Sequence, residues 1–317
     1  MKRHQGKLNS IKDAIEIIKE PYKKYWFRGH ANENWGLIPS VFRPNAEGQF
    51  YDEAKLLSEF IRLHPESKEK HHNTFELLTY AQHYGLPTRL LDWTENLLVA
   101  LYFACQDEKH LDTDGKLFLM KAGKTKYSPF STLFSNTDFW GCLITTTGSN
   151  NVFSFLHAKE LVINSIILAF ESDQSNSKIH LYFDNLKMEE VKYRITNGGN
   201  YYCMDNSPLD VKFSSSPEIT QLLADYIHLH SPAMINQRLV SQAGCFTVHP
   251  GKIVGGKEVI PVKDPQDSYP EEIESFVIPS NAKPTILNEL KHCGIHEATL
   301  FPELEYKTKH IRQYCTY

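Results

Sequence analysis

Cysteine is scarce in this sequence, and its spacing is not that of a metal or redox site. Six cysteines are spread over 317 residues, and no two of them form a Cys-x-x-Cys pair. This spacing argues against a structural zinc site and a thioredoxin-like redox motif, and a chain of this size does not depend on disulfides. We therefore expect no metal site, and free thiols in a reducing cytoplasm.

Long apolar runs are also lacking. The longest, such as 97–105 and 161–170, fall well short of the roughly 20 residues that a membrane span requires. The first 20 residues contain neither an unbroken apolar stretch nor a small-residue cleavage site, so they do not resemble a secretory signal. These features predict a cytoplasmic protein that does not insert into a membrane.

Neither sign of charge dominates, and several enzyme motifs are missing. The chain has 34 lysines and arginines against 38 aspartates and glutamates, for a net charge of −4. No strongly basic domain therefore indicates nucleic-acid binding, although a local basic cleft stays open. The sequence contains no Walker loop, no Gly-x-Ser-x-Gly elbow and no His-Glu-x-x-His motif, which sets those enzyme classes aside.

The spacing of apolar residues predicts both helices and strands. The hydrophobic share of 41% and the charged share of 23% are ordinary for a globular protein. Helical spacing of apolar residues predicts helices at 11–19, 51–63, 75–84, 95–105, 217–230 and 284–292. Short apolar or aromatic runs predict strands at 25–27, 88–93, 116–120, 161–170, 179–183, 211–213, 239–248 and 274–278.

The chain shows no internal repeat and no low-complexity linker. We predict an N-terminal helix over 1–24, followed by a single domain over 25–317. Residues 124–150 are rich in Ser, Thr, Asn and Gly, which is typical of long loops. The middle of the domain, about 121–235, is therefore interpreted as an elaboration of the core.

Four ordered blocks of sequence resemble the FRG domain. They are YWFRGHANENWGLIPSVFRP at 25–44, AQHYGLPTRLLDWTENLLVALYFAC at 81–105, NQRLVSQAGCFTV at 236–248 and LNELKHCGIHEATLFPELE at 287–305. The family takes its name from a Phe-Arg-Gly triplet, here Phe27, Arg28 and Gly29. Such domains occur in bacteria and phages, often beside defence or toxin genes. The resemblance thus implies a role in a bacterial toxin or in antiphage defence, with a phage or host macromolecule as target.

The order of elements also resembles ADP-ribosyltransferases of the Arg-Ser-Glu type. In those enzymes a first strand ends in an arginine that holds the phosphates of NAD, and a later Ser/Thr-centred strand precedes an apolar helix. Arg28 is similar to the first element, and residues 91–94 followed by 99–104 are similar to the second. The resemblance implies an α/β (α+β) fold with mixed, largely antiparallel sheets flanked by helices, and NAD as substrate.

A third element of that family, a glutamate shortly before a glycine-containing strand, is missing. Residues 237–244 contain no carboxylate, and Arg238 stands near the expected place. Two alternatives follow. The carboxylate role has moved, with Asp92 as first candidate, or the fold serves another reaction or a non-catalytic module that senses a nucleotide, a nucleic-acid end or a phage protein.

Each candidate residue has a functional and a structural interpretation. The planar fork of Arg28 suits a phosphate clamp, and its alternative is an ion pair that braces a strand end. Gly29 allows close approach of a backbone or ligand. His30 and His83 titrate near neutral pH, which suits general acid–base work, and either could equally be a buried histidine that bonds a carbonyl.

The segment from 88 to 94 completes the predicted site. Arg89 and Asp92 lie between leucines, so they either pair with each other or mark a strand end that forms a site. Trp93 either stacks on a base or belongs to the core, and Thr94 is expected to cap a helix that would also attract phosphate. We predict His83, Asp92 and Gln242 as catalytic residues, and a ligand-binding set of Arg28, Gly29, His30, Arg89, Trp93 and Thr94.

Overall fold

The computed structural model describes eleven stretches of the chain, and these carry the fold. They are residues 4–20, 24–67, 74–122, 201–202, 208–209, 227–232, 236–249, 252–254, 258–260, 264–268 and 272–315. The strands predicted at 161–170, 179–183 and 211–213 lie outside these stretches, as does most of the helix predicted at 217–230.

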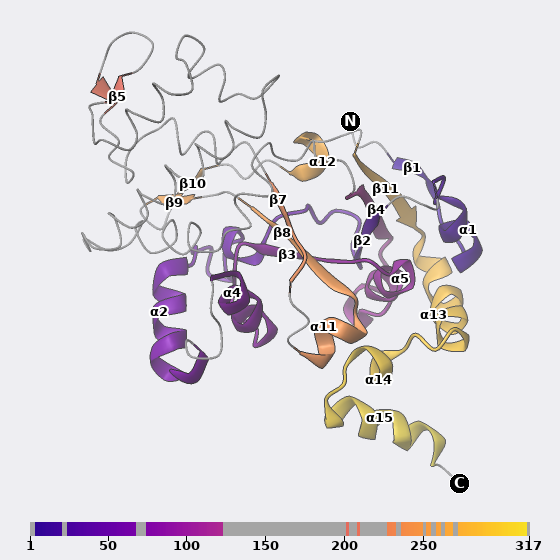
Figure 1. Cartoon of the computed structure of the whole chain (residues 1–317). Coiled ribbons are helices and arrows are strands. Elements are labelled where there is room, and N and C mark those ends of the chain that lie inside the picture. Colours follow the sequence, from indigo (N-terminus) through magenta and orange to yellow (C-terminus); the bar gives the residue numbers. More distant parts are fainter. Residues whose placement is uncertain are drawn as a thin grey trace.

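A seven-stranded sheet forms the centre of the molecule (Figure 1), in the order β1-β11-β4-β2-β3-β8-β7. Neighbouring strands run antiparallel except β1, which is parallel to β11. The expectation of a mixed α/β chain with a largely antiparallel sheet is confirmed. The strands are β1 His4–Lys7, β2 Tyr25–His30, β3 Leu90–Thr94, β4 Gly115–Lys121, β7 His228–His230, β8 Gly244–Val248 and β11 Ile273–Ile278, and two short pairs are β5 Tyr201–Tyr202 with β6 Pro208–Leu209 and β9 Lys252–Val254 with β10 Glu258–Ile260.

Both faces of the central sheet are buried, as strand β4 shows. Leu117 and Leu119 belong to one apolar cluster, whereas Phe118 and Met120 belong to another. Because successive side chains of a strand point to opposite faces, the two clusters lie on opposite sides of the sheet. The helices are α1 Ile11–Glu16, α2 Glu53–Leu63, α4 Thr74–His83, α5 Leu97–Cys105, α11 Gln237–Ser241, α12 Pro265–Ser268, α13 Lys283–His292, α14 Glu297–Leu300 and α15 Leu304–Tyr314, with 3-10 turns η1 Ser40–Phe42, η2 Glu108–His110 and η4 Ser280–Ala282.

Helix α5 packs so closely on β2 that only glycine fits at position 29. A Cβ atom added to Gly29 would lie 1.9 Å from the carbonyl oxygen of Ala100 on α5. The expected close approach is therefore made by α5 itself. Helix α5 is buried almost all round, as predicted, but its N-cap is Asn96, whose side chain accepts the Leu98 N–H at 2.9 Å. The prediction of Thr94 as the cap is wrong, because Thr94 is the last residue of β3.

Several elements differ from the sequence predictions. The strand predicted at 239–248 begins only at Gly244, because Asn236 caps a short helix, α11, by accepting the Leu239 N–H at 2.7 Å. Residues 228–230, predicted to end a helix, form strand β7 on β8. The N-terminal helix predicted over 1–24 is limited to α1, and the polar segment His4–Lys7 is instead strand β1, which pairs with β11 although its sequence shows no apolar alternation.

Candidate functional site

A pocket of about 390 Å³ opens where strands β2 and β3 part. The ladder between these strands consists of one residue pair, Phe27 with Thr94. Helix α5, helix α11 and the loop after β2 supply the other walls. The lining residues are Phe27, Arg28, Gly29, His30, Ala31, Trp35, Gly36, Ile38, Arg43, Gln82, Asp92, Trp93, Thr94, Val99, Ala100, Phe103, Gln106, Asp107, Arg238 and Gln242.

Arg28 bridges the two parting strands. It lies inside β2, which continues to His30, and not at the strand end that the sequence predicted. Its Nε donates to Nε2 of His30 at 2.8 Å, and its Nη1 donates to the main-chain oxygen of Asp92. Nη1 also lies 3.7 Å from Oδ2 of Asp92, with the two side chains 19% and 64% exposed. Burial lowers the pKa of Arg28, and the Asp92 charge opposes this shift.

His30 is neutral and accepts a hydrogen bond from Arg28. Because Nε2 accepts the Arg28 N–H, the ring proton resides on Nδ1, which donates to the Trp35 carbonyl at 3.2 Å. Burial, followed by the charge of Arg28, holds the pKa of His30 well below its usual value. The ring therefore orients the guanidinium near neutral pH and supplies no positive charge to the pocket.

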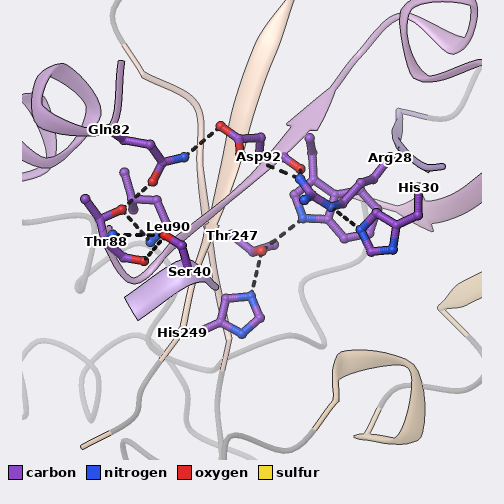
Figure 2. A network of polar contacts seen from close by, with 10 residues as sticks. Arg28, His30, Ser40, Gln82, Thr88, Leu90, Asp92, Thr247 and His249 are labelled. Atoms are coloured by element: carbon purple, nitrogen blue, oxygen red, sulfur yellow. Dashed lines mark hydrogen bonds and ion pairs between the residues drawn. The ribbon is translucent and has the colours of Figure 1, made fainter. Parts of the chain in front are cut away.

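A chain of side-chain hydrogen bonds reaches Asp92 from the opposite side (Figure 2). Gln82 on α4 donates from Nε2 to Oδ1 of Asp92 at 2.7 Å. The hydroxyl of Thr88 donates in turn to Oε1 of Gln82. Asp92 thus stands between Gln82 and Arg28, with one carboxylate oxygen near each of them.

The charge of the lining is predominantly positive. Arg28, Arg43 and Arg238 face two carboxylates, Asp92 and Asp107. Within the described ranges no carboxylate pairs with Arg43, which is exposed and close enough to help lower the pKa of Arg28. Arg238 lies over the Phe301 ring, 4.8 Å from its centroid. Three guanidinium groups around one cavity favour an anionic occupant.

Three further predicted residues line this pocket, and each makes hydrogen bonds that hold the surrounding elements together. Trp93 is buried and donates from Nε1 to the Thr247 hydroxyl at 2.9 Å. The Thr94 hydroxyl donates to the Gln242 carbonyl at 2.6 Å and accepts the Asn96 N–H at 3.0 Å. Gln242 donates from Nε2 to the Leu300 carbonyl at 3.2 Å. These bonds fix β3, α11 and α14 around the cavity.

Arg89 and His83 are not among the lining residues. Arg89 is buried against Glu53, with Nη2 2.6 Å and Nε 3.0 Å from the same carboxylate oxygen, so its ion pair is with Glu53 and not with Asp92. Its guanidinium also lies over the Phe42 ring. His83 ends α4, where burial and then the Arg238 charge lower its pKa.

Several lining residues were given no role in the sequence predictions. Trp35 and Arg43 stand in the same block of sequence as Arg28, and the exposed ring of Trp35 is an unusual surface aromatic. Gln82 directly precedes His83 along α4, and Arg238 was noted only as the residue near an expected glutamate. Proximity in sequence to Arg28 and His83 was the available signal for the first three.

Neither a metal cluster nor a membrane span is found in the part of the chain that the structure describes. No group of three or more His, Cys, Asp or Glu side chains comes together there as metal ligands would. None of the helices in these ranges is long and apolar enough to cross a bilayer.

Comparison with known families identifies one region. Residues 23–113 match the family model of the FRG domain, which confirms that resemblance for this part of the chain. No curated protein and no solved structure matches the sequence. The matched region contains Arg28, His30, Gln82 and Asp92, whereas Arg238 and Gln242 lie beyond it.

Proposed function

We propose, for a chain that carries an FRG domain over residues 23–113, that the Arg28 pocket binds a phosphate-bearing nucleotide of the NAD type. The observation that carries this proposal is the convergence of three arginines on one cavity, with Arg28 fixed by His30 and Asp92. Guanidinium groups bind phosphate oxygens by charge-assisted hydrogen bonds, and a fixed fork loses little entropy on binding.

The hydrogen bonds of Arg28 leave one edge for a ligand. Nε is used by His30 and Nη1 by the main chain of Asp92. In the described stretches nothing accepts from Nη2, so both of its hydrogens can meet a phosphate oxygen. Arg43 adds a second cation beside it. Trp35, 43% exposed on the same lining, offers a ring on which a base can stack.

A second candidate function, ADP-ribosyl transfer or NAD cleavage, is favoured by Asp92. Its carboxylate is exposed beside Arg28, where it could stabilise the positive charge that develops on a ribose. This is the role of the late glutamate in the ADP-ribosyltransferases that the order of elements resembles, and Arg238 stands near the expected place of that glutamate in this sequence. His83 and Arg89 have no part in this proposal, because they lie outside the pocket lining.

The competing function is a non-catalytic sensor that uses the same pocket. In either case we propose a cytoplasmic role in bacterial toxin action or antiphage defence, with a phage or host macromolecule as target. A sensor would hold the nucleotide, or a nucleic-acid end that carries a phosphate, without breaking a bond.

Calorimetric titration of NAD, ADP-ribose and pyrophosphate into the protein tests the proposal. We expect saturable binding of all three, since each carries adjacent phosphates. Parallel incubation with NAD, followed by mass spectrometry for nicotinamide and transferred ADP-ribose, decides between enzyme and sensor. Binding without turnover favours the sensor, and absence of binding by every one of these ligands would refute nucleotide binding.

A further inference from the structure

The direction of the hydrogen bonds behind Asp92 is fixed by its side chain, because a carboxylate can only accept. Oδ1 of Asp92 accepts from Nε2 of Gln82 at 2.7 Å, so the amide oxygen Oε1 of Gln82 faces Thr88. The Thr88 hydroxyl donates to Oε1 of Gln82, while its oxygen accepts the Leu90 N–H at 3.2 Å. Every group in this series of hydrogen bonds then has a partner.

Thr88 is held rigidly at the start of this series of hydrogen bonds. Its side chain is fully buried, and its main-chain N–H donates to the Ser40 hydroxyl oxygen at 3.2 Å. The Ser40 hydroxyl donates back to the Thr88 carbonyl at 3.4 Å. Figure 2 shows these contacts leading from Ser40 and Thr88 through Gln82 to Asp92. An anchored donor thus orients a carboxylate that is itself 64% exposed.

The two oxygens of Asp92 therefore differ. Oδ1 is occupied by Gln82, whereas Oδ2 is 3.7 Å from Nη1 of Arg28, beyond hydrogen-bond distance. Arg28 does not need the relay for its own position, because His30 and the main-chain oxygen of Asp92 hold it. Oδ2 is left as an oriented acceptor beside a phosphate-binding guanidinium.

We propose that Gln82 and Thr88 are positioning residues that present Oδ2 of Asp92 to a hydroxyl group of the ligand. This inference rests on the proposed function. A carboxylate oxygen accepts a hydroxyl and repels a further phosphate, so the pocket discriminates in favour of ribose-bearing phosphates over bare polyphosphates. The arginines bind the phosphate part of the ligand, and the relay to Asp92 selects the sugar next to it.

The test compares ADP-ribose with pyrophosphate in calorimetric titrations of variants of the full chain. Gln82→Ala removes the donor to Oδ1 and lets the Asp92 side chain rotate. We expect ADP-ribose to bind about 3- to 10-fold more weakly, because the ligand must then immobilise the mobile Asp92 side chain when it binds. Pyrophosphate should bind as to the original protein. Gln49→Ala, at an exposed glutamine outside the pocket lining, should change neither affinity.

Thr88 provides a second, independent pair of variants. Thr88→Val deletes the hydroxyl and should reproduce the effect of Gln82→Ala, whereas Thr88→Ser should restore ADP-ribose affinity. If Thr88→Val fails to fold, the Gln82→Ala comparison alone decides. Equal weakening of both ligands, or unchanged ADP-ribose affinity in Gln82→Ala, would overturn the positioning role. If the original protein binds neither ligand, the proposed function fails first, and this inference fails with it.

Discussion

Replacement of Arg89 by methionine should remove a large part of the free energy of unfolding. Arg89 and Glu53 are 6% and 9% exposed, and the methionine variant would leave the Glu53 carboxylate buried without its cation. Breaking a buried pair by removing one partner costs about 3–5 kcal/mol. That is a large share of the roughly 5–15 kcal/mol by which domains are stable. Urea denaturation followed by circular dichroism measures the loss.

The matched replacement Arg28→Met should cost less. The partner carboxylate of Arg28 is 64% exposed and 3.7 Å away, so solvent screens the ion pair, and what is lost is its hydrogen bonding to His30 and Asp92. We expect about 1–3 kcal/mol, because the buried Nε2 acceptor of His30 is left without its donor. The double variant Glu53→Met/Arg89→Met should recover most of the stability lost in Arg89→Met, since it buries no lone charge.

Comparison of the two variants distinguishes an arginine that stabilises the fold from one that serves ligand binding. A loss below about 1 kcal/mol in Arg89→Met would refute the assignment of a structural ion pair, since buried pairs cost several times as much to break. Equal losses in Arg28→Met and Arg89→Met would refute the contrast between them. In that case Arg28 would brace the sheet, which is the structural interpretation that its sequence context also allows.

Three further outcomes are expected. Gly29→Ala should destabilise the protein by about 1–3 kcal/mol or more, because α5 leaves no room for a methyl group, whereas Gly6→Ala, with open space around it, should not; equal melting temperatures would contradict this. The pKa of His30 is depressed by burial, so the unfolded imidazole takes up a proton below about pH 6.5 while the native one does not. Stability should therefore fall as pH drops from 7 to 5, and more gently in His30→Gln, with an unchanged slope counting against it. Burial raises the pKa of Cys105 to about 12, so native alkylation at pH 8, mapped by mass spectrometry, should modify exposed Cys293 and spare Cys105; rapid labelling of Cys105 would contradict its burial.

Local pattern predicted the elements that build the site. The aromatic run at 25–27 and the apolar segment at 88–93 are strands β2 and β3, and the apolar run after Asn96 is α5. Continuous apolar runs indicate buried segments, and their length and the turn residues at their ends separate a strand from a helix. The ends of these three elements moved by one to three residues, and the start of α5 is set by the capping side chain of Asn96.

Long-range pairing could not be predicted in the same way. Arg89 and Asp92 are three residues apart, yet one pairs with Glu53, 36 residues earlier, and the other with Arg28, 64 residues earlier. Nothing local in the segment decides which charge faces the core. Arg43 and Arg238 likewise reach the pocket through the tertiary fold, from the loop after β2 and from α11.

Titration of ADP-ribose into the original protein and into Arg28→Met is the direct test of phosphate binding by Arg28. We expect saturable binding to the original protein and at least a tenfold lower affinity in the variant, since charge-assisted hydrogen bonds contribute about 1.5–3 kcal/mol. The variant should keep its cooperative unfolding transition. Equal affinity for both proteins would contradict the claim, because Arg28 would then not bind the phosphates.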